Sequence, residues 1–106
     1  MKRGDVVTVA VSGDYGKPRP ALVVQADVFD EHPSVVVLPL TSEIHETPLF
    51  RVKVAAGRAT GLRVASQIMV DKATTVPRVK LGPRIGEVDA ATMLAVDEAL
   101  REFLGL

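Results

Sequence analysis

The sequence has 106 residues, 47% of them apolar but only 4% aromatic, and thirteen basic side chains balance thirteen acidic ones. This length fits one domain with one hydrophobic core, and the balance excludes the strong positive field of a non-specific nucleic-acid binder. The absence of cysteine excludes disulfides, thiolate nucleophiles and Cys-ligated zinc. We therefore expect a single domain over residues 1–106 whose core consists mainly of Val, Leu, Ile and Ala.

The first half of the chain has the pattern of short strands separated by turns. Segments rich in β-branched or other apolar residues predict strands over residues 6–11, 20–25 and 34–40. Turn-forming residues between the first two strands predict an exposed loop, where binding groups often lie. Because Pro39 interrupts the third segment and cannot donate a ladder hydrogen bond, we expect an edge strand or a bulge near Thr41.

The second half predicts further strands and then a helix. Residues 49–54 alternate apolar and basic side chains, and residues 62–70 and 74–81 are also typical of strands. From Asp89 onward, apolar residues recur at three- and four-residue steps, which predicts an amphipathic C-terminal helix that ends at Gly105. We expect the last apolar residues, Phe103 and Leu104, to belong to the core. Five or six short strands and one helix predict a small barrel with a helix packed on it.

Several enzyme classes lack their motifs, and the chain has no long apolar segment. There is no P-loop, no Gly-x-Ser-x-Gly and no His-Glu-x-x-His motif. His32 and His45 lie in polar segments and fit solvated loop residues better than metal ligands, so no metal or other cofactor is expected. Since the longest apolar runs are far shorter than a membrane span, we expect a soluble cytoplasmic protein without membrane contact.

A basic group and several polar groups are candidates for chemistry. Lys17-Pro18-Arg19-Pro20 fixes the backbone around a guanidinium whose planar donors suit phosphate oxygens, although Arg19 could equally pair with a carboxylate. The hydroxyls of Thr41 and Ser42 could bind a phosphate or ribose, or their own backbone. Gln67 could contact a base edge or sugar, or satisfy a neighbouring strand. Tyr15, the only tyrosine, is a candidate for stacking on a base.

The order of these segments resembles the MazF/PemK toxin family over nearly the whole chain. The resemblance is carried by four motifs: Arg3-Gly4-Asp5-Val6-Val7, Lys17-Pro18-Arg19-Pro20-Ala21-Leu22-Val23-Val24, Leu38-Pro39-Leu40-Thr41-Ser42 and Ser66-Gln67-Ile68. It implies a mainly β fold, a small SH3-like β-barrel of five to seven short strands with a C-terminal helix.

The resemblance also implies the toxin of a type II toxin-antitoxin system. Such a toxin is a sequence-selective, metal-independent endoribonuclease that cleaves single-stranded RNA through 2′-hydroxyl attack and leaves a cyclic phosphate. It implies a homodimer that carries RNA along its interface and is neutralised by a cognate antitoxin. Arg19 and Thr41 map to the catalytic pair, and Tyr15, Lys17, Ser42 and Gln67 are the candidate RNA-binding residues.

The chemistry of arginine limits the role of Arg19. Because a guanidinium almost never loses its proton, Arg19 is a poor general base and is better suited to stabilising charge on the phosphate. Thr41 would add a hydroxyl hydrogen bond, and the acceptor of the 2′-proton stays open, with His45 as one candidate. Two alternatives also remain: a CcdB-like poison of DNA gyrase that acts through an exposed C-terminal helix, and a catalytically silent binding module of the same fold.

Overall fold

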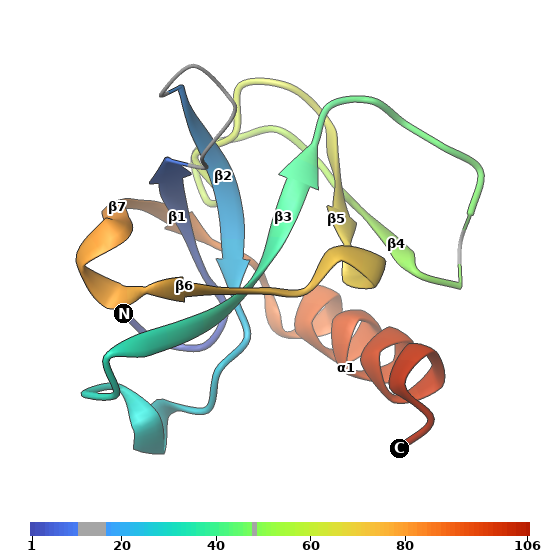
Figure 1. The fold of residues 1–106 in the computed structure, drawn as a ribbon. Helices are drawn as coiled ribbons and strands as arrows, with labels where there is room; N and C mark the ends of the chain where they lie inside the picture. Colours follow the sequence, from blue (N-terminus) through green and yellow to red (C-terminus); the bar gives the residue numbers. More distant parts are fainter. Residues whose placement is uncertain (11–16, 48) are drawn as a thin grey trace.

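The computed structural model describes residues 1–10, 17–47 and 49–106 (Figure 1). Along these residues it contains seven strands: β1 (Asp5–Ala10), β2 (Pro18–Val23), β3 (Ser34–Thr41), β4 (Arg51–Val54), β5 (Ser66–Met69), β6 (Thr74–Pro77) and β7 (Leu81–Glu87). Three short 3-10 helices, η1 (Asp27–Phe29), η2 (Val70–Lys72) and η3 (Arg78–Lys80), precede the helix α1 (Ala90–Leu104). The predicted mainly β fold with a C-terminal helix is confirmed.

The strands form one curved antiparallel sheet rather than a closed barrel. Its order is β4-β5-β3-β2-β1-β7, and β6 pairs with the first half of β3. Within the described residues no ladder joins β4 to β7, so the sheet is barrel-like but open. The loop after β4 lies across this opening, where the Glu87 amide donates a 2.8 Å hydrogen bond to the Ala59 carbonyl.

The core lies on both faces of the central strands. On one face, Leu22, Leu38 and Ile68 are fully buried beneath α1, which contributes Val96. On the other face a second cluster contains Val7, Val9, Ala21, Val23, Val35, Val37 and Val76. Because β1, β2 and β3 are covered on both sides, their sequences are nearly continuous apolar runs rather than alternating patterns.

Two local features differ from the sequence predictions. Strand β7 was not predicted, because Gly82, Pro83 and Gly86 give it the composition of a turn. The predicted edge or bulge near Thr41 is wrong, since β3 is a central strand without a recorded register shift there. Instead β3 changes neighbour around Pro39: its pairing with β6 ends at Val37 and its pairing with β5 begins at Leu40.

Helix α1 begins and ends as its sequence predicts. The Asp89 carboxylate accepts a 2.7 Å hydrogen bond from the Thr92 amide. Hydrogen bonding from the Thr92 side chain and from this amide holds the pKa of Asp89 below its usual value. Gly105 ends the helix with a positive φ of 71°. The expectation that the last apolar residues are core is wrong, because Phe103 and Leu104 remain 49% and 56% exposed. The ring of Phe103 contacts the ring of Phe50, which packs against the edge of the core. No helix in the described ranges is long and apolar enough to cross a membrane.

A buried carboxylate joins the two strands β1 and β7. Asp5 accepts hydrogen bonds from the Lys2 amide at 2.8 Å and from Arg84 Nε at 3.0 Å. Burial alone would raise the pKa of Asp5, but these two donors outweigh it and hold the pKa below its ordinary value. Asp5 therefore stabilises the folded state above its unfolded pKa, and this contribution disappears as the pH falls through its folded pKa.

We expect Asp5→Asn to lower the free energy of unfolding at pH 7 by about 1–3 kcal/mol, because it removes charged acceptors from two donors. Urea unfolding of both proteins between pH 7 and pH 3 measures the difference. The gap between the variant and the parent protein should close in the acidic range, where the parent also loses its carboxylate. A gap of constant size at every pH would show that charge on Asp5 does not stabilise the fold.

Candidate active site

Two predicted residues from different strands meet in one groove of about 480 Å³. Arg19 comes from β2 and Thr41 from the end of β3, and Ser42 follows Thr41 on the same rim. The opposite wall consists of the segment before β5, which contributes Arg63, and of the first residue of β5, the buried Ser66. With Thr8 of β1, the groove therefore combines two guanidinium groups with four hydroxyls.

The sheet register explains why Arg19 and Thr41 meet. Ala21 of β2 pairs with Pro39 of β3, so moving two residues further along both antiparallel strands places Arg19 opposite Thr41. Residues opposite each other on neighbouring strands project from the same face of a sheet. Arg19 is exposed, and the prolines at 18 and 20 hold it in strand β2 against β1. A charged donor is thus presented from rigid backbone rather than from a loop.

Thr41 has its hydroxyl oriented by the turn that follows β3. Thr41 Oγ1 accepts a 3.1 Å hydrogen bond from the Glu43 amide. This bond uses a lone pair and leaves the hydroxyl hydrogen available to a phosphate or ribose oxygen. The sequence left two alternatives for the Thr41 hydroxyl, a bond to its own backbone or a contact with a substrate. The observed geometry permits both at once. Ser42 is exposed beside it.

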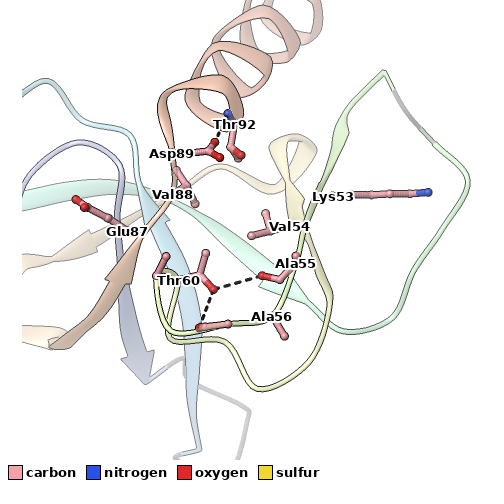
Figure 2. Close-up of a pocket in the computed structure, with 11 residues that line it drawn as sticks. Lys53, Val54, Ala55, Ala56, Thr60, Glu87, Val88, Asp89 and Thr92 are labelled. Carbon is pink, nitrogen blue, oxygen red and sulfur yellow. Dashed lines mark hydrogen bonds between the residues drawn. The ribbon is translucent and has the colours of Figure 1, made fainter.

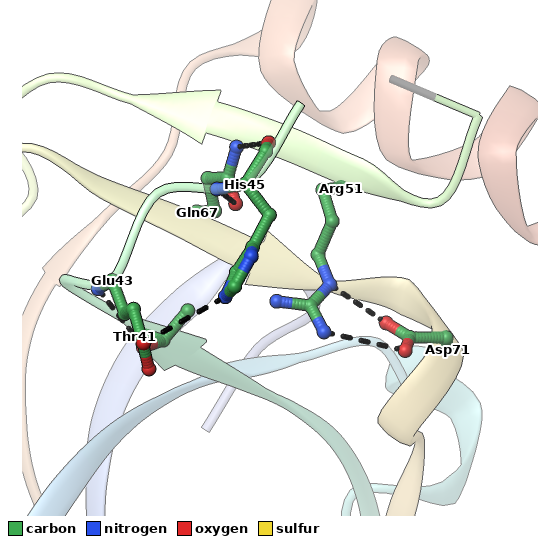
Figure 3. A network of polar contacts seen from close by, with 6 residues as sticks. All are labelled: Thr41, Glu43, His45, Arg51, Gln67 and Asp71. Atoms are coloured by element: carbon green, nitrogen blue, oxygen red, sulfur yellow. Dashed lines mark hydrogen bonds and ion pairs between the residues drawn. The ribbon is translucent and has the colours of Figure 1, made fainter. Parts of the chain in front are cut away.

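Gln67 faces its own chain instead of the groove (Figure 3). Its side chain is 1% exposed, accepts a 3.0 Å hydrogen bond from the His45 amide and donates a 2.7 Å hydrogen bond to the His45 carbonyl. These bonds favour the alternative in which Gln67 satisfies neighbouring backbone, and its contact with a base or sugar stays a prediction. Gln67 holds the loop 42–47 against β5.

The remaining predicted residues contribute less to the groove. Lys17 is exposed just before β2 and is not among the residues that line the groove. Tyr15 lies outside the described residues. Arg63 is not among the site residues predicted from the sequence, and nothing in its local pattern could have shown that its loop folds over the groove.

Another pocket, of about 330 Å³, lies between the loop after β4 and the start of α1 (Figure 2). Its wall is rich in alanine, and its polar groups bond within the chain: Thr60 donates to the Ala55 carbonyl, and Asp89 caps the helix. It contains none of the predicted site residues. Over the described ranges, no group of three His, Asp or Glu side chains is placed to hold a metal ion.

Comparison with known proteins relates this chain to a family. The family model of the PemK-like, MazF-like toxins of type II toxin-antitoxin systems matches residues 2–104. The chain belongs to this toxin family. Among its MazF-like relatives, the probable endoribonuclease MazF of Mycolicibacterium smegmatis is 46% identical over 107 residues, covering 100% of this chain and 98% of the relative. Endoribonuclease EndoA of Bacillus subtilis is 32% identical over 112 residues, covering 100% and 96%.

Solved structures of MazF-like proteins share the fold. The Mycobacterium tuberculosis toxin MazF-mt6 superposes with a TM-score of 0.83 at 27% identity, covering 96% of this chain and 97% of that chain. A mycobacterial endoribonuclease in complex with its cognate antitoxin gives a TM-score of 0.81 at 30% identity, covering 100% and 96%. The open sheet and terminal helix of this chain are therefore the architecture of the MazF-like fold.

Proposed function

We propose that this MazF-like toxin is a sequence-selective endoribonuclease that cleaves single-stranded RNA at the groove between Arg19 and Thr41. The observation that carries the proposal is that both side chains line one groove, two residues beyond the paired Ala21 and Pro39 of β2 and β3. Curated relatives that span the whole chain are named endoribonucleases, which supports the same activity. The substrate class is single-stranded RNA, including messenger RNA.

In the proposed reaction the ribose 2′-hydroxyl attacks the adjacent phosphorus, and the bond to the 5′-oxygen of the next nucleotide breaks. The products are a 2′,3′-cyclic phosphate and a 5′-hydroxyl end, so no metal-bound water is needed. Arg19 stabilises the negative charge that builds on the phosphate oxygens, and the Thr41 hydroxyl orients the same group. Arg63, across the groove, adds a second positive charge. His45 lines a different pocket, so this arrangement does not assign it the 2′-proton.

The rival interpretations lose support at this groove. If the protein were a gyrase poison acting through α1, the groove formed by Arg19, Thr41 and Arg63 would have no assigned role. A silent binding module would not need a guanidinium fixed between two prolines beside an oriented hydroxyl. Family membership favours the ribonuclease over the gyrase poison, although the exposed end of α1 is a feature that the gyrase interpretation requires.

The experiment is incubation of the purified protein with diverse single-stranded RNA in EDTA, followed by sequencing of the fragments. We expect cuts at one short sequence motif, and the sequenced ends identify that motif. Intact RNA across diverse sequences would contradict the ribonuclease proposal. Inhibition of supercoiling by gyrase in a parallel assay would favour the CcdB-like alternative instead.

The proposed partners are a cognate antitoxin and a second copy of the chain. A solved relative is described in complex with its cognate antitoxin, which supports an antitoxin partner for this toxin. Val28 and Val79, at 80% and 93% exposure, leave apolar surface on the single chain. We expect sedimentation velocity at micromolar concentration to give twice the chain mass of 11.3 kDa. A single monomeric species would contradict the homodimer.

A further inference from the structure

The row of residues that contains Arg19 and Thr41 continues across the rest of the sheet. Thr41 pairs with Gln67 of β5, and Gln67 pairs with Lys53 of β4. Their neighbours Leu40, Ile68 and Val52 project from the opposite face into or against the core. One outer face therefore carries, in order, Arg19, Thr41, Gln67 and Lys53. Two strand spacings, about 10 Å, separate Thr41 from Lys53.

The loop 42–47 folds over this row and encloses a third, smaller pocket. Gln67 clamps the loop through both hydrogen bonds to the His45 backbone (Figure 3). The pocket has a volume of about 140 Å³ and is lined by His45, Glu46, Thr47, Arg51, Lys53 and Gln67. It thus begins one strand beyond Thr41 and faces the same side of the sheet.

The polar groups of this pocket are unevenly satisfied. Arg51 is held by Asp71, with its Nε and one Nη at 3.0 and 3.4 Å from the carboxylate oxygens. Lys53, in contrast, is exposed and has no ion-pair partner in the described part of the chain. Thr47 Oγ1 is buried and has no hydrogen-bond partner among the described residues. An unpaired hydroxyl in a buried position is costly unless a ligand or water satisfies it.

We propose that this loop pocket is a second RNA subsite, which takes a nucleotide close to the cleaved bond. The Lys53 ammonium contacts the phosphate of that nucleotide, while Thr47 and Glu46 meet its base inside the pocket. Three stacked nucleotides, at about 3.4 Å each, cover the distance from Thr41 to Lys53. The Glu46 carboxylate would repel a phosphate inside the pocket, but it can accept hydrogen bonds from the amino group of a base. The base of the nucleotide, not its phosphate, therefore enters the pocket.

This subsite rests on the proposed function and is tested separately from it. The probe is a single-stranded RNA with the mapped cleavage motif, made uncleavable by a 2′-O-methyl group at the cut. We expect Lys53→Gln to weaken binding about three- to tenfold and to reduce the slope of log affinity against log salt by about 0.7–1. On the cleavable RNA, KM rises by the same factor while kcat is unchanged.

Lys80→Gln is the charge-matched control, because Lys80 precedes β7 at the other end of the strand order and should bind like the parent. Thr47→Val keeps the shape of the pocket and should alter the preferred base at one position of the sequenced motif. Equal affinity and salt slope for Lys53→Gln and the parent would overturn the subsite while leaving the Arg19 and Thr41 site intact. Failure of the parent to cut any RNA would overturn the proposed function instead.

Discussion

Arg19→Ala is expected to slow RNA cleavage by about 10²–10³-fold, the usual cost of removing one preorganised donor from a developing negative charge. The loss should appear in kcat more than in KM, because the guanidinium acts mainly where charge builds on the phosphate. The fold should persist, since the side chain is exposed on the rim of the groove. Cleavage of the mapped RNA in EDTA, together with thermal unfolding, measures both effects.

Matched variants make this result specific. Arg19→Lys keeps the charge but loses the planar set of donors, so its rate should fall between those of the parent and Arg19→Ala. Thr41→Val keeps a β-branched side chain at the end of β3 and removes only the hydroxyl, so it should lower kcat without unfolding the protein. Arg101→Ala, on α1, removes a positive charge away from the groove and should leave cleavage unchanged. Full activity in Arg19→Ala would remove Arg19 from the mechanism.

Gly61→Ala is expected to destabilise the protein by about 3 kcal/mol or more. Gly61 has a positive φ of 74°, and a Cβ there would lie 2.1 Å from the Ile85 carbonyl oxygen of β7. Because this contact is between two backbones, neither partner can move away cheaply. The substitution disturbs the loop that lies across the opening of the sheet and lines the groove beside Arg19 and Thr41. Urea unfolding at neutral pH measures the loss.

Gly105→Ala separates the cost of the positive φ from the cost of the steric clash. Gly105 has a similar positive φ of 71°, but a Cβ there would meet nothing within 4 Å. Its substitution should therefore cost only the conformational term, about 1–2 kcal/mol. If Gly61→Ala and Gly105→Ala were equally destabilising, the close approach of the loop to β7 would contribute nothing to stability.

The sequence predicted the strands that have strong apolar patterns and missed what depends on distant contacts. Strands β1 to β6 and α1 were recognisable because their β-branched runs or helical periodicity exceed local turn signals. Strand β7 was not recognisable. Its glycines, Gly82 and Gly86, lie where Thr8 and Thr60 approach the strand closely, and local composition does not reveal such contacts. The exposed end of α1 could not be foreseen either, because periodicity shows a face but not where the core ends.

The candidate site was predictable in its chemistry but not in its full composition. The Arg19 and Thr41 motifs could be selected because proline and hydroxyl neighbours are local features. Gln67 looked like an RNA contact, and only the folded loop shows that its amide is used by His45. Arg63 and Lys53 were not predicted as site residues. Arg63 reaches the groove of Thr41 only through the path of its loop, and Lys53 shares a face with Thr41 only through the strand register.

The central claim is that the groove between Arg19 and Thr41 cleaves RNA through the ribose 2′-hydroxyl. The most direct test uses the mapped substrate with a single 2′-deoxy nucleotide at the cut, compared with the all-ribose RNA in EDTA. We predict that the all-ribose RNA is cut to a 2′,3′-cyclic phosphate and a 5′-hydroxyl, and that the deoxy substrate stays intact. Cleavage of the deoxy substrate at the same bond, or cleavage only after a divalent metal is added, would contradict the proposed mechanism.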